Sequence, residues 1–165
     1  MSVERCGECG FDSEDWSDAS AIAAIRRLPS QWIAAVAGLT PSDQLRRPVH
    51  QMWSIAEYAD HLREVLFGMR FLLDTAISQP GTDLGESPQP QFDSQPRQID
   101  VEAALSGIGN EAHSLTQQLS GLSSYDWPLT VTFDGTSVDQ HWIARHIVHD
   151  ATHHLLDIDR LRSAL

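Results

Sequence analysis

The segment 54–78 constrains the fold more than any other, because a strong helix-start signal is followed by a long apolar repeat. Ser54-Ile55-Ala56-Glu57 is a capping box, in which the serine and glutamate side chains each accept a hydrogen bond from the other residue's backbone N–H. Trp53 and Tyr58 stand at the positions of a hydrophobic staple. This pattern predicts an amphipathic helix that ends near Ser78. Its apolar positions are Ile55, Ala59, Leu62, Leu66, Met69 and Leu73.

Residues 18–39 show the same apolar spacing and predict an earlier helix. Ser17 or Asp18 is a suitable N-terminal cap, because either side chain can accept a hydrogen bond from a free backbone N–H. Pro29 has no N–H to donate and its ring crowds the preceding turn, so we expect it to break or kink this helix. Thr40-Pro41 then ends the segment.

The second half of the chain predicts two more helices. Residues 100–121 follow a cap at Asp100, and Ser137-Val138-Asp139-Gln140 has the form of a second capping box. The helix that this box opens continues almost to the end of the sequence. Before it, 129–133 alternates like a strand and leads into Asp134-Gly135, which favours a turn. We expect a short hairpin or an extended connector there.

Four helices with little strand predict an all-α fold. With 165 residues, 41% of them apolar, the chain is long enough for one domain with a proper core. Residues 79–98 are rich in proline and polar residues, which predicts a long crossover loop between the second and third helices. Residues 1–17 are expected to form an irregular arm, and 18–165 the helical domain.

The charge balance argues against two classes of partner. The formal net charge is −12 at pH 7, so neither nucleic-acid phosphates nor anionic membrane lipids attract the chain. No stretch reaches the roughly 18 apolar residues of a membrane span. The polar N-terminus lacks the apolar core of a signal peptide. We therefore expect a cytoplasmic protein that acts on a small-molecule substrate.

The last predicted helix carries a cluster of histidines between 146 and 154. His149 and His153 lie one helical turn apart, where two imidazoles can bind one metal ion. If the helices pack as a bundle, His61 can converge on the same ion. Three imidazoles leave positions open for water and substrate, as in a catalytic site. The competing interpretation is a metal-free set of hydrogen-bonded histidines. Candidates to hold the second ring nitrogens are Glu57, Glu64, Asp150 and Asp157.

The motif Cys6-Gly7-Glu8-Cys9 is half of a zinc site. Two thiolates at this spacing can share one ion, but two more ligands are needed, and histidines or a second subunit would have to supply them. Two other interpretations stay open: a mobile arm with reducible thiols, and a redox-active pair. Redox motifs of this kind normally follow a strand and open a helix. The chain has two cysteines in all, so we expect no disulfide framework.

Two segments resemble the DinB-like family. Residues 53–62, WSIAEYADHL, are similar to its W-S-x-x-E…H-L start of the second helix, and 149–158, HDATHHLLDI, resemble its C-terminal H-x-x-x-H helix. The family includes bacillithiol and mycothiol transferases and the mycothiol-dependent maleylpyruvate isomerase. The resemblance implies a four-helix up-down-down-up bundle with the long crossover between helices two and three. It also implies a homodimer and a Zn, Ni or Fe ion held by His61, His149 and His153.

The resemblance further implies a metal-dependent enzyme that transfers a low-molecular-weight thiol or hydrolyses its substrate. The ion would lower the pKa of a bound thiol or water and so supply the nucleophile. Isomerase-type members carry Glu at the position of His149, so isomerisation is not the expected reaction. His146 is the candidate for support of the ligands or proton transfer. The alternative from another class is a non-catalytic metal-binding or stress-related interaction protein.

Overall fold

The protein is described by a computed structural model that covers residues 3–49, 51–86 and 95–165. Within these residues, four long helices form a bundle, and a two-stranded antiparallel hairpin closes one end. The predicted all-α fold and the short hairpin around Asp134-Gly135 are both confirmed. In chain order the elements are η1 Ser13–Asp15, α1 Asp18–Val36, α2 Pro41–Leu45, α3 Ile55–Ser78, α4 Val101–Gly121, β1 Thr130–Phe133, β2 Thr136–Asp139 and α5 Gln140–Ala164.

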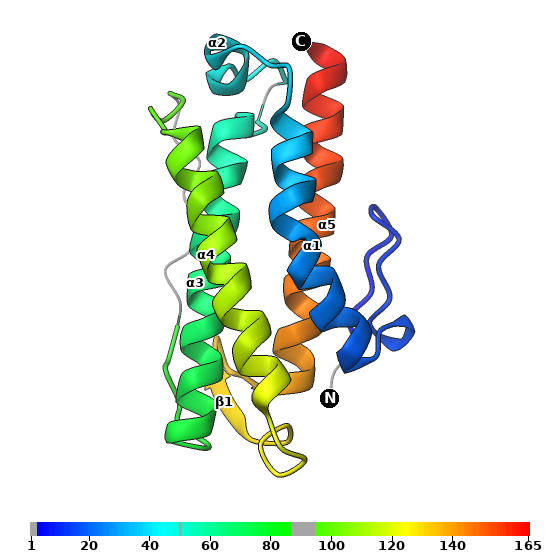
Figure 1. The fold of residues 1–165 in the computed structure, drawn as a ribbon, viewed down its shortest axis with the longest axis vertical. Coiled ribbons are helices and arrows are strands. Elements are labelled where there is room, and N and C mark those ends of the chain that lie inside the picture. The colour runs from blue at the N-terminus through cyan, green and yellow to red at the C-terminus, as the bar shows by residue number, and fades with distance from the viewer. Residues whose placement is uncertain (1–2, 50, 87–94) are drawn as a thin grey trace.

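The long helices follow an up-down-down-up path. Figure 1 shows α1 and α5 rising through the molecule while α3 and α4 descend. Both α1 and α3 pack against α4 and α5, so α1 and α3 stand diagonally across the bundle. Two successive descending helices require a long return connection, which the segment between α3 and α4 provides; residues 87–94 of the predicted crossover lie outside the described part.

The predicted start of α3 is confirmed. Ser54 Oγ accepts a hydrogen bond from the Glu57 backbone N–H at 3.2 Å, and Glu57 Oε2 accepts one from the Ser54 N–H at 2.8 Å. The rings of Trp53 and Tyr58 meet edge to face with centroids 5.5 Å apart, as a hydrophobic staple requires. The helix ends at Ser78, the predicted position.

Pro29 does not break the helix, because α1 continues through it from Asp18 to Val36. Leu28 and Trp32 on either side of the proline are buried in the core, with 3% and 0% of their surface exposed. Burying two large apolar side chains stabilises the helix by several kcal/mol, enough to offset the roughly 3 kcal/mol cost of an internal proline. Past the end of α1, Thr40-Pro41 opens the short helix α2, which the sequence pattern missed.

The predicted capping box at 137–140 is also wrong. Ser137 belongs to β2, and the cap of α5 is Asp139, whose carboxylate accepts a hydrogen bond from the Trp142 N–H at 2.9 Å. The helix therefore begins at Gln140. Its buried apolar stripe consists of Ile143, Ala144, Ile147, Val148, Ala151, Ile158 and Leu161.

The expected irregular arm is a folded hairpin that docks on the bundle. Arg5 and Asp12 pair across it, and the Cys6 N–H donates to the Phe11 carbonyl at 2.9 Å. Phe11 is 6% exposed and stacks on the ring of His149, with centroids 4.7 Å apart. Figure 1 shows this segment, in dark blue, beside α5 and α1. We call residues 4–13 the N-terminal hairpin.

The described ranges 3–49, 51–86 and 95–165 hold no helix that combines the length and the apolar character needed to cross a membrane.

Candidate metal centre

Three groups of side chains in the described part of the chain bring ligand atoms within 4.8 Å of one another. The α3–α5 group contains His61, Asp150 and His154; the hairpin group contains Cys6, Cys9, His149 and His153; a third group contains Glu4, His146 and His149.

The α3–α5 group lies between two facing helices. The rings of His61 and His154 are edge to face with centroids 5.1 Å apart. His154 Nε2 is 3.5 Å from Asp150 Oδ1. The other carboxylate oxygen, Asp150 Oδ2, is buried and has no hydrogen-bond partner among the described residues. An unpaired buried carboxylate oxygen is costly, and a bound cation would satisfy it.

Asp157 fixes the orientation of His154. Its carboxylate is buried and lies 3.1 Å from His154 Nδ1, which leaves Nε2 to face Asp150. A carboxylate on the far nitrogen of a histidine is the usual support of a metal ligand, because it sets the tautomer and raises the basicity of the ligating nitrogen. Burial and the nearby Asp157 charge raise the pKa of Tyr58 to about 12, so the phenol that packs on His154 stays protonated.

His61 is packed so that its neutral form is favoured. Its ring packs against Trp53, with centroids 4.9 Å apart, and against His154. Burial lowers the pKa of His61, and the Asp150 carboxylate only partly opposes this shift. A neutral imidazole has a lone pair for a metal ion, whereas a protonated one has none.

Glu57 anchors the start of the helix that carries His61. The side chain is 1% exposed, pairs with Arg47, and accepts a hydrogen bond from the Arg97 backbone N–H at 3.1 Å. Burial alone would raise the pKa of Glu57, but the hydrogen bonds from Arg47 and two backbone N–H groups outweigh it and lower the pKa to about 2. Glu57 thus ties Arg47, before α3, and Arg97, near the end of the crossover, to the start of α3. This structural role differs from the predicted support of a histidine.

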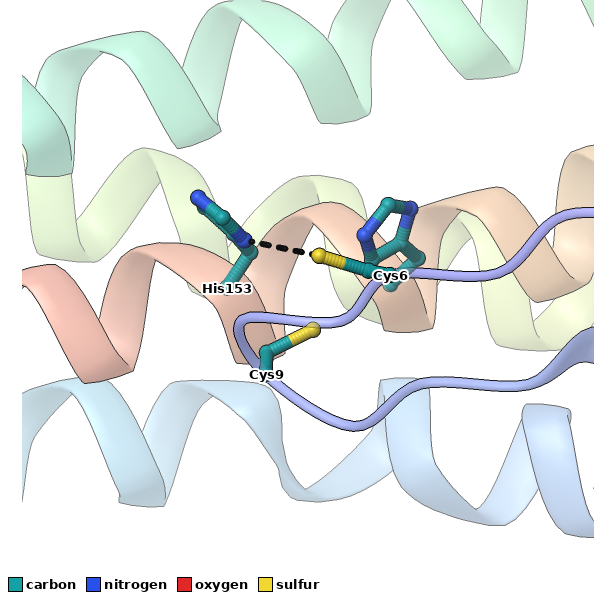
Figure 2. Close-up of side chains that lie close together, drawn as sticks. Cys6, Cys9 and His153 are labelled. Carbon is teal, nitrogen blue, oxygen red and sulfur yellow. Dashed lines mark hydrogen bonds between the residues drawn. The ribbon is translucent and has the colours of Figure 1, made fainter.

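The hairpin group lies on another side of α5. Figure 2 shows Cys6 and Cys9 on the N-terminal hairpin beside His153, with Cys6 Sγ 3.5 Å from His153 Nδ1. Backbone N–H groups of Cys9 and Glu8, together with the His149 imidazole, lower the pKa of Cys6 to about 6. Burial raises the pKa of Cys9. Cys6 is therefore the more acidic of the two thiols.

The third group joins His146 to His149 through Glu4. Glu4 Oε1 lies 2.9 Å from His146 Nδ1 and 2.6 Å from His149 Nδ1. Burial opposes the shift, but the two imidazoles lower the pKa of Glu4. His146 also stacks on Trp142, with ring centroids 4.3 Å apart. Both histidines use Nδ1 on this carboxylate, so the group is a hydrogen-bonded support and differs from an open ligand set.

The structure divides the predicted ligand set. His61 is in the α3–α5 group, while His149 and His153 are in the hairpin group. The single His61–His149–His153 site therefore stays a prediction that this geometry does not realise. His146, predicted to support the ligands or to transfer protons, is linked to His149 through Glu4 Oε1. Sequence reasoning placed Asp150 among the supporting carboxylates and did not select His154 as a ligand.

A hollow of about 440 Å³ begins one helical turn beyond His61 on α3. Val65, Gly68, Met69 and Leu72 line it from α3, on the helical face that also carries His61. Phe71 of α3, Phe133 of β1 and residues 84–86 complete its walls. The lining is mostly apolar, as in small-molecule sites.

Comparisons with known proteins place the chain in a family. Among solved structures, YfiT from Bacillus subtilis, described as "a probable metal-dependent hydrolase with an unusual four-helix bundle topology", matches with a TM-score of 0.74. The two sequences are 12% identical, and the match covers 99% of this chain and 95% of that one, which establishes a shared fold. No curated protein matches the sequence. The family model described as mycothiol S-transferase matches residues 22–165, and the chain therefore belongs to the mycothiol S-transferase family.

Proposed function

We propose that the protein is a metal-dependent enzyme that transfers a low-molecular-weight thiol to an electrophilic small molecule, with His61, Asp150 and His154 as ligands. The observation that carries this proposal is the convergence of three ligand atoms from two facing helices, with one carboxylate oxygen buried and unpaired. Membership of the mycothiol S-transferase family supports mycothiol as the thiol. Two imidazoles and one carboxylate suit Zn²⁺, and also Ni²⁺ or Fe²⁺.

Three protein ligands leave positions for water or substrate, which is the coordination pattern of catalytic sites. A divalent ion held there would act as a Lewis acid and lower the pKa of a thiol or water at neutral pH. The protein residues supply orientation: Asp157 holds His154 at Nδ1, and the rings of Trp53 and Tyr58 shield the histidines from solvent.

The transfer reaction balances without a further reagent. The thiol gives its proton to water, its sulfur forms a bond to the electrophilic carbon, and that carbon releases its leaving group with the bonding electron pair. The apolar hollow beside α3 is suited to the body of the electrophile, because it begins one turn beyond His61 on the same face of the helix.

Hydrolysis is the second candidate reaction. The structural neighbour YfiT is described as a metal-dependent hydrolase, and the same open ligand set can activate water in place of a thiol. The two reactions differ in the nucleophile, so omission of the thiol separates them in one assay.

The test is a conjugation assay with mycothiol and a chromogenic aryl halide, on full-length protein loaded with zinc, nickel or iron. We expect thiol-dependent turnover that His154→Ala reduces to background together with loss of about one metal ion per chain. His113→Ala is the matched control, because His113 is an exposed histidine of α4 and should change neither quantity.

Wild-type turnover and full metal content in His154→Ala would contradict the ligand assignment. Turnover that persists without thiol would show that the reaction is hydrolysis and not thiol transfer.

A further inference from the structure

The hairpin group has a full set of four ligands and lies outside the α3–α5 group. We propose that Cys6, Cys9, His149 and His153 bind a structural zinc ion that ties the N-terminal hairpin to α5. This site is independent of the proposed function, because none of its four residues belongs to the α3–α5 group.

The distances match a tetrahedral zinc site. Zinc–sulfur and zinc–nitrogen bonds of about 2.3 and 2.0 Å at tetrahedral angles place a sulfur and a nitrogen ligand about 3.5 Å apart. Cys6 Sγ and His153 Nδ1 are 3.5 Å apart, and all four ligand atoms lie within 4.8 Å of one another. The side chains therefore need little movement to enclose one ion.

The backbone that carries the two cysteines forms a tight turn, and the Cys6 N–H donates to the Phe11 carbonyl at 2.9 Å. Gly10 closes the turn with φ at +75° and donates its N–H to the Cys6 carbonyl at 3.0 Å. A side chain at this φ would be strained, which explains the glycine directly after the second cysteine.

His149 has one nitrogen committed and one free. Glu4 Oε1 lies 2.6 Å from Nδ1, whereas Nε2 is buried without a hydrogen-bond partner among the described residues. This is the carboxylate–histidine arrangement that orients a zinc ligand. A zinc ion would satisfy the buried Nε2 at the same point where the two sulfur atoms approach.

The ligand set distinguishes this ion from the one in the proposed active site. Two thiolates and two imidazoles fill the four positions of zinc and leave none for substrate, so the ion is structural. The hairpin also contacts α5 through the stacking of Phe11 on His149, the hydrogen bonds between Glu4 and the rings of His146 and His149, and an ion pair between Glu8 and Arg160 at 3.3 Å. Metal binding would add to this attachment.

Cobalt substitution tests the proposal directly. We expect full-length protein loaded with Co²⁺ to show an intense near-ultraviolet band from thiolate-to-cobalt charge transfer, and strong visible bands of a tetrahedral ion. One equivalent of Zn²⁺ should abolish both sets of bands. Cys6→Ser/Cys9→Ser should lose them together with about one metal ion per chain, while circular dichroism reports unchanged helix content.

The matched control is Asp150→Ala/His154→Ala, which removes ligands of the other group and should keep the thiolate–cobalt bands. Absence of these bands in the wild type, or their survival in the double serine variant, would overturn the proposal. If only the Asp150→Ala/His154→Ala variant loses metal, the proposal is also overturned. If only the serine variant loses metal, the zinc site is supported and the proposed active site is contradicted.

A second measurement does not depend on the folding of any variant. In the wild-type protein, bound Zn²⁺ should protect both thiols from alkylation, and a chelator should expose them. Equal alkylation rates with and without zinc would contradict the site. Glu4→Gln should weaken zinc binding by about 10- to 100-fold, the usual effect of removing a carboxylate behind a histidine ligand.

Discussion

Two sides of α5 carry pairs of candidate metal ligands with the same spacing and different surroundings. The pair at 150 and 154 faces α3, which adds one histidine, and the pair at 149 and 153 faces the N-terminal hairpin, which adds two cysteines. One residue along a helix is a rotation of about 100°, enough to direct neighbouring side chains to different elements. The i,i+4 spacing determines that two ligands can share an ion; the facing element determines how many ligands join them.

The largest expected effect is the difference in activity between variants of the adjacent residues His149 and Asp150. Asp150→Ala should lower thiol-transfer activity by about a thousand-fold, because loss of the ion removes several kcal/mol of transition-state stabilisation. His149→Ala should leave the rate within about ten-fold and weaken cobalt binding at the hairpin group, because it removes one of four ligands there. Rates and cobalt spectra of both variants check this. Identical changes in the two variants would show that the two groups form one site.

Glu57→Gln tests whether the α3 side depends on its anchor. Removing one partner of this buried ion pair should lower the free energy of unfolding by about 3 kcal/mol or more near neutral pH. The pKa of Glu57 in the folded protein, about 2, lies below the ordinary 4.5. Its stabilisation is therefore complete above pH 4.5 and is lost as the pH falls towards 2. Urea unfolding of the wild type and Glu57→Gln between pH 7 and pH 2 should show that their difference in unfolding free energy shrinks as the pH falls. A difference that stays constant would contradict the role of Glu57 as an anchor.

Phe11→Ala tests the docking of the N-terminal hairpin. Truncating this 6% exposed ring should cost about 3 kcal/mol of stability. Phe67→Ala is the matched control, since Phe67 is 54% exposed on α3 and its loss should cost under about 1 kcal/mol. Thermal unfolding of metal-free protein measures both, and equal effects would show that the hairpin contributes nothing to the bundle.

The smallest effect is expected at Asp157, whose carboxylate lies near a histidine of each group. Asp157 lies 3.1 Å from His154 Nδ1 and 3.8 Å from His153 Nε2. Asp157→Asn should therefore weaken metal binding at both groups, by about 10- to 100-fold at the α3–α5 group and less at the hairpin group. Competition with a chelator gives both affinities. Asp159→Asn, an exposed position two residues on, should change neither.

Much of the fold could be predicted because its determinants are local. The Ser54–Glu57 box and the cap at Asp100 each use atoms within four residues, and both helices begin where these signals stand. The continuity of α1 through Pro29 could not be predicted, because it depends on burial of Leu28 and Trp32 against other helices. Local propensity is a weak prior against such packing.

The predicted ligand set differs from the groups in the structure for a related reason. Histidines occur around much of α5, so spacing alone permits more than one pair. A signal was present in the apolar stripe: His154 lies seven residues after Ile147 and seven before Leu161, both fully buried. The stripe that faces the core therefore passes through His154. No pattern in the sequence indicates that the hairpin folds back to bring Cys6 within 3.5 Å of His153.

The wide separation of the ligands along the chain has a consequence for synthesis. Cys6 and His153 are 147 positions apart, and His61 likewise waits for partners in α5. A chain still on the ribosome can expose its cysteines and the first histidine, but neither group can close before the last helix emerges. Metal loading is therefore expected to be a late, post-translational event, and truncated products should leave the ribosome without a stable ion.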